Sequence, residues 1–124
     1  MTDREFTAEK KRVTAAIRHW HQRLLLTNFD LHLEFDRTGE QMLGDACMMI
    51  HPNWKYMRAA IRINPRDTAS LTDERLDWVV LHELGHLIVN EMTPAGDADD
   101  HEERICTMIA NAIYFSTFGH MPND

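Results

Sequence analysis

The sequence is poor in the residues that mark several classes of protein. It has only two cysteines, Cys47 and Cys106, and no C-x-x-C pair, so neither a disulfide framework nor a cysteine zinc site is expected. We expect both thiols to be small buried residues. Glycine and proline are also scarce, with five and four residues in 124, while the hydrophobic content of 44% is that of a globular chain. These features favour a single folded domain, residues 1–124.

Long apolar runs and an excess of positive charge are also missing. No apolar stretch approaches the roughly 20 residues that cross a membrane, and no signal core follows the charged N-terminus. We therefore expect no membrane partner and a cytoplasmic location. The chain has 13 Lys and Arg against 20 Asp and Glu, a net charge of −7. Because binding to nucleic acid requires clustered positive charge, we expect no nucleic-acid partner.

One motif dominates the second half of the chain. His82, Glu83 and His86 form an H-E-x-x-H sequence inside an apolar stretch. Residues four apart share one face of an α-helix, so the two imidazoles can point at one metal ion, and the carboxylate can reach a metal-bound water. These polar groups would be costly to bury in an apolar helix, and a metal would satisfy them. The pattern therefore indicates a zinc metallopeptidase site rather than two hydrogen-bonded core histidines.

The third metal ligand is less certain from the residues alone. A catalytic zinc usually has three protein ligands, and the extended motif H-E-x-x-H-x-x-G-x-x-H fails because Val89 and Met92 replace its Gly and His. The next helix offers three candidates, His101, Glu102 and Glu103. Its apolar residues place Glu102 near the middle of the buried face and Glu103 at the flank, so this face argument favours Glu102. We expect a capping or solvent-exposed role for His101.

The hydrophobic periodicity predicts an α+β sandwich with a small, mostly antiparallel sheet packed on helices. Thr7 and Ser70 are the expected N-caps of the first helix and of the motif helix. The expected helices are an N-terminal helix over 7–27, the H-E-x-x-H helix over 71–92 and a C-terminal helix over 101–118. The expected strands are 31–35, followed by a hairpin of 46–50 and 57–63 joined by a turn over 51–55.

The stretch Val79–Leu87 resembles the signature of small gluzincin-type metallopeptidases. It is similar to that of the ImmA/IrrE-like group and of the compact zincin-like proteins of phages and mobile elements. In these proteins a second helix carries a glutamate followed by apolar residues, in a pattern like Glu103-x-Ile105-Cys106-x-x-Ile109-Ala110. The resemblance implies a minimal zincin-like metalloprotease fold and selects Glu103, over Glu102, as the third zinc ligand. It also implies that the strand Met57–Ile63 is an edge strand that binds extended peptide.

Together, the motif and the resemblance imply a zinc metalloendopeptidase that acts on a peptide or protein substrate. Zinc held by His82, His86 and Glu103 would lower the pKa of a bound water, and Glu83 would be the general base. The alternative is a non-catalytic or partner-dependent zincin-fold binding module that retains a metal site, with a partner that the sequence does not identify.

Three further residues bear on this site. Tyr114 and His120 are candidates for an additional donor to the oxyanion of the transition state, although a packing role is favoured for Tyr114 and a place in the C-terminal tail for His120. Gly85 lies inside the motif helix, where glycine costs about 1 kcal/mol of helix stability relative to alanine. Its presence predicts the close approach of a neighbouring element.

Overall fold

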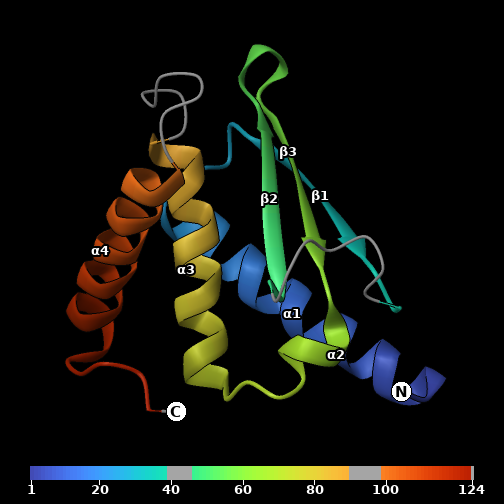
Figure 1. Ribbon diagram of the computed structural model, residues 1–124. Helices are drawn as coiled ribbons and strands as arrows, with labels where there is room; N and C mark the ends of the chain where they lie inside the picture. Colours follow the sequence, from blue (N-terminus) through green and yellow to red (C-terminus); the bar gives the residue numbers. More distant parts are fainter. Residues whose placement is uncertain (39–45, 90–98, 124) are drawn as a thin grey trace.

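The structure is a computed structural model that describes residues 1–38, 46–89 and 99–123 (Figure 1). It is an α+β arrangement of helices and a three-stranded sheet, which confirms the expected class. In chain order the elements are α1 (Asp3–Arg23), β1 (Asp30–Phe35), β2 (Met48–Asn53), the 3-10 turn η1 (Trp54–Tyr56), β3 (Arg58–Ile63), α2 (Pro65–Thr68), α3 (Asp73–Val89) and α4 (Asp99–Phe118). Within the described ranges, no helix has both the length and the apolar character to span a bilayer.

The sheet is mixed rather than mostly antiparallel, which corrects the prediction. β3 is the central strand, with β1 parallel to it on one side and β2 antiparallel to it on the other. The predicted hairpin is present as β2 and β3, but β2 continues through residues 51–53, which were assigned to the turn. The chain instead reverses through η1 and Met57, whose φ of 52° is left-handed. Alternation of apolar residues indicates the faces of a strand but not its direction, so the parallel β1–β3 pair was not predicted.

The strand order also changes which strand lies at the edge. β3 was expected to be an edge strand, and this was wrong because both of its sides are paired. β2 is an edge strand instead, and it lies against α3. Pro52 lies within β2. Proline has no N–H to donate and is confined to edge strands or bulges, so Pro52 was the sequence signal for this edge.

The helices cover one face of the sheet. In β3 the buried residues alternate, and they meet the apolar faces of α1 and α3. The central core residues are Val13, Ile17 and Trp20 from α1, Ala59, Ile61 and Ile63 from β3, and Val80, Leu81, Leu84 and Leu87 from α3. This core fixes the motif helix against the sheet.

Two of the predicted helix starts are corrected. α1 begins before Thr7, because Thr2 and Glu5 form a capping box at its N-terminus. α3 is capped by Thr72, whose Oγ1 accepts the N–H of Arg75 at 3.1 Å. Ser70 instead donates its hydroxyl to the carbonyl of Asp67 at 2.7 Å. The predicted end of the motif helix at residue 92 lies outside the described residues.

α4 packs along α3 in the opposite direction (Figure 1). The two helices come close where Cys106 of α4 faces Gly85 of α3. The close approach predicted for Gly85 is therefore present. Cys106 is buried, as expected, whereas Cys47 is only partly buried. The contact places the first turns of α4 beside the H-E-x-x-H motif.

Candidate metal centre

The H-E-x-x-H motif lies in the second half of α3, as predicted. His82 and His86 are one turn apart, with ring centroids separated by 5.4 Å. Both histidines are only partly buried, while Leu81, Leu84 and Leu87 of the same helix are buried in the core. The apolar residues therefore anchor α3 and leave the two imidazoles at the boundary of the core.

Glu103 of α4 joins the two imidazoles. Its Oε2 lies 2.8 Å from Nε2 of His82, and its Oε1 lies 2.9 Å from Nε2 of His86. One donor atom from each of the three residues lies within 4.8 Å of the others. Two imidazole nitrogens and a carboxylate oxygen form a ligand set that catalytic zinc sites use. A divalent cation could replace the protons that otherwise bridge these nitrogen and oxygen atoms, so the donor set fits a metal.

Glu102 contacts the imidazole of His86 on the side opposite to Glu103. Its Oε1 lies 3.1 Å from Nδ1 of His86. Glu102 is 7% exposed, whereas the side chain of Glu103 is 53% exposed. The face argument correctly identified Glu102 as the more buried residue, but the group whose geometry could hold a metal contains Glu103. His101, the remaining candidate, is exposed and lies outside this group.

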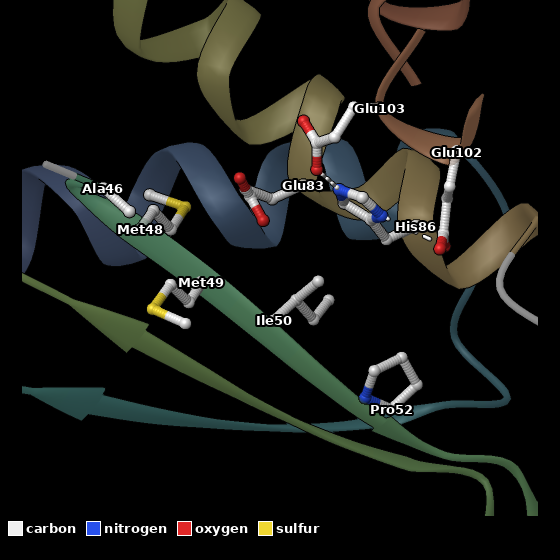
Figure 2. Close-up of a pocket in the computed structure, with 9 residues that line it drawn as sticks. All are labelled: Ala46, Met48, Met49, Ile50, Pro52, Glu83, His86, Glu102 and Glu103. Atoms are coloured by element: carbon white, nitrogen blue, oxygen red, sulfur yellow. Dashed lines mark hydrogen bonds and ion pairs between the residues drawn. The ribbon is translucent and has the colours of Figure 1, made fainter. Parts of the chain in front are cut away.

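Glu83 lies beside His86 on the side of α3 that faces β2 (Figure 2), and it is outside the group of His82, His86 and Glu103. Burial, with a further contribution from the charge of Glu103, raises the pKa of Glu83 to about 8. Burial also lowers the pKa of His82, although the neighbouring Glu103 carboxylate opposes this shift. The site therefore favours uncharged forms of both groups when no cation is present.

A pocket of about 430 Å³ opens between β2 and the two helices (Figure 2). The helices contribute its polar side, and β2 together with Ala46 contributes the apolar side. The lining residues are Glu83, His86, Glu102 and Glu103 on the helices, and Ala46, Met48, Met49, Ile50 and Pro52 on and next to β2. Sequence reasoning assigned no site role to the β2 residues.

The edge of β2 that faces away from β3 borders this pocket, and it carries backbone N–H and C=O groups that do not pair with β3. The N–H of Asn64 donates to the carbonyl of Cys47 at 2.9 Å, which makes this pair a hydrogen-bonded one. In an antiparallel ladder, hydrogen-bonded residue pairs alternate with non-hydrogen-bonded pairs. In the observed register, every second residue after Cys47 along β2 therefore forms backbone hydrogen bonds to β3. Met48, Ile50 and Pro52 alternate with these residues. Their backbone groups are therefore directed to the edge, where none of the described strands pairs with β2.

The two candidate oxyanion donors lie elsewhere. Tyr114 is 1% exposed and packs against Phe118, with ring centroids 4.5 Å apart. Nε2 of His120 lies 4.0 Å from Oε1 of Glu74, in the first turn of α3. Both residues are thus at the end of α3 opposite to the group of His82, His86 and Glu103. The packing role favoured for Tyr114 is confirmed, and neither residue is placed to act as an oxyanion donor at this group.

Comparison with known proteins adds no family assignment. No protein-family model matches the chain, and no curated protein is significantly similar to it in sequence. The resemblance to small gluzincin-type metallopeptidases therefore stays a hypothesis. The function has to be inferred from the chemistry of the site.

Proposed function

We propose that the chain is a zinc-dependent metallopeptidase of a minimal gluzincin type. The observation that carries this proposal is the convergence of three groups from two helices on one point. Ligand atoms of His82, His86 and Glu103 lie within 4.8 Å of one another, and His86 and Glu103 also line the pocket. Glu83 lines the same pocket and is separate from this set.

The residues of the site divide into ligands and a proton carrier. His82, His86 and Glu103 would hold the ion, which when bound supplies Lewis-acid chemistry by acidifying water and polarising a carbonyl group. Glu83 accepts the proton of the attacking water and then delivers it to the leaving amine. In the metal-free chain burial raises the pKa of Glu83 to about 8, so the ionised form that the first transfer requires would depend on the positive charge of a bound ion.

The edge of β2 supports an extended peptide as the substrate. The backbone groups of Met48 and Ile50 face the open side of the strand, beside Glu83, and can pair with an added strand. Pro52 has no N–H, so pairing weakens toward that end of β2. The apolar side chains of β2 in the pocket suit apolar side chains of a substrate.

Glu83→Gln tests the catalytic part of this proposal. We expect the variant to keep one zinc ion per chain, measured by elemental analysis, and to lose at least about 100-fold in hydrolysis of a quenched-fluorescent peptide library. Glu34→Gln is a suitable control, because Glu34 pairs with Arg62 in the sheet at 3.1 Å and does not line the pocket. Equal hydrolysis by Glu83→Gln and the wild type would contradict the assigned role.

The second candidate function is a metal-retaining binding module without catalytic activity. The composition of the pocket favours it, because apart from His86 the nine described lining residues include no hydroxyl, amide or basic side chain. Such a donor usually stabilises the oxyanion in acyl transfer. A wild-type protein that binds zinc and retains library peptides without cleaving them would support the binding module over the peptidase.

A further inference from the structure

We propose that Glu102 is a positioning residue that holds the imidazole of His86 with Nε2 directed at the metal. This inference rests on the proposed zinc site, and it concerns a residue that takes no ligand position there. It assigns different tasks to two adjacent glutamates of α4. Glu103 completes the ligand set, and Glu102 orients one of its members.

The geometry around His86 supports this division. Oε1 of Glu102 lies 3.1 Å from Nδ1, and Oε1 of Glu103 lies 2.9 Å from Nε2. If a metal occupies Nε2 of His86, the proton of the neutral imidazole is on Nδ1, from which Oε1 of Glu102 is within hydrogen-bond distance. The neutral imidazole then has its lone pair on Nε2, which is the nitrogen that faces Glu103 and His82.

Glu102 is placed for this task by rigid packing. It is almost fully buried, and Cys106, one turn further along α4, packs against Gly85 of α3. Gly85 directly precedes His86, so the contact between the helices sets the distance from Glu102 to the imidazole. A buried carboxylate is costly unless polar groups satisfy it, and the N–H of His86 is one such group.

The two histidines are therefore held by different means. The ring of His82 lies against Trp78, at a centroid distance of 5.4 Å. Trp78 is itself fixed, because its indole N–H donates to Oδ1 of Asn111 at 2.9 Å. Packing orients His82, whereas a hydrogen bond to Glu102 orients His86. Removing the Glu102 carboxylate should affect His86 alone among the ligands.

Zinc affinity of three Glu102 variants tests the inference. Glu102→Met removes the acceptor at similar volume, Glu102→Ala removes the side chain, and Glu102→Gln keeps an oxygen that can accept the same hydrogen bond. In chelator-competition titrations we expect the Met and Ala variants to bind zinc about 10- to 100-fold more weakly than the wild type. We expect Glu102→Gln to recover most of this loss. Arg104→Ala, at a neighbouring exposed residue, is the control and should bind as the wild type does.

A second readout separates orientation from a general loss of structure. In nitrogen-15 spectra of the zinc-loaded protein, we expect the Nδ1–H of His86 to be observed for the wild type and Glu102→Gln, and to be shifted or lost in Glu102→Met. Far-ultraviolet circular dichroism should be unchanged among these proteins. Equal zinc affinity of the Met and Gln variants would overturn the inference while the zinc site stood.

Two other results of the zinc-binding measurements would lead to different conclusions. A wild type that binds no zinc would overturn the proposed function, and the role of Glu102 with it. Complete loss of zinc in Glu102→Ala, with retention in Glu103→Ala, would make Glu102 the ligand and would overturn its role as a positioning residue.

Discussion

Gly85 and Cys106 meet where α3 crosses α4. A Cβ atom placed on Gly85 would lie 3.6 Å from Cα, Cβ and Sγ of Cys106. This is an ordinary van der Waals distance, so the crossing has room for a methyl group at residue 85. Close packing beside His86 therefore does not require glycine at this position.

Gly85→Ala should be tolerated. Alanine has the higher helix propensity, and the free energy of unfolding of the metal-free protein should rise by up to about 1 kcal/mol. Gly85→Val should instead force the helices apart and lower this free energy by about 1–3 kcal/mol. Urea denaturation of the wild type, Gly85→Ala and Gly85→Val measures both changes in the free energy of unfolding. A loss of stability in Gly85→Ala would show that the helices approach more closely than the structure indicates.

Glu103→Ala should abolish stoichiometric zinc binding. The substitution removes the carboxylate that contacts both imidazoles, and two histidines alone hold zinc weakly. His101→Ala is the matched control, because His101 is exposed, lies two residues away and was a candidate ligand. Elemental analysis after gel filtration should find about one zinc per chain in the control. Zinc loss in His101→Ala with retention in Glu103→Ala would reverse the assignment.

The stability of the metal-free protein should depend on pH through Glu83. Its pKa is raised from 4.5 to about 8 in the folded chain, so the folded state binds a proton that the unfolded state releases. The stabilisation from this proton is complete below pH 4.5 and is lost as the pH rises through about 8. Glu83→Gln removes this dependence, so the variant should exceed the wild type in stability at pH 9 by up to a few kcal/mol.

Urea denaturation in the presence of a chelator, at pH 5 and pH 9, measures the difference between the two proteins. Titrating groups that do not interact with Glu83 contribute equally to both proteins and cancel in the comparison. A stability difference that is the same at both pH values would contradict the raised pKa of Glu83.

Ile50→Pro should weaken peptide cleavage more than Ile50→Ala does. Both variants lose the partly buried side chain, but only proline also removes the N–H that faces the open edge of β2. The ladder to β3 does not use this N–H, so the two variants should have similar stability. The comparison requires kcat/KM on one library peptide and a thermal melt. Equal kcat/KM values would argue against substrate pairing at this edge.

The local parts of the site were predictable, and the long-range parts were not. His82, Glu83 and His86 follow from spacing on one helix, and spacing is a local property. Glu103 was selected by resemblance, because a face argument ranks residues by burial and so favours Glu102. Burial alone does not reveal which nitrogen of His86 a carboxylate reaches. That depends on how α4 crosses α3 at Gly85, which no local pattern encodes.

Prediction of the sheet from local sequence patterns was limited in the same way. The residues of β1, β2 and β3 were largely recognised, but their order and the parallel pairing of β1 depend on contacts between distant segments. Pro52 carried a local signal for the edge strand. It was interpreted as part of a turn because proline is common in both settings.

The proposed ligand set draws His82 and His86 from α3 and Glu103 from α4, so metal binding there would be thermodynamically linked to folding. An ion that binds only the folded chain, at 100 times its dissociation constant, adds about 2.7 kcal/mol to the free energy of unfolding. In a cell short of zinc, more copies would unfold and be degraded. The lifetime of the protein would then follow the supply of the metal.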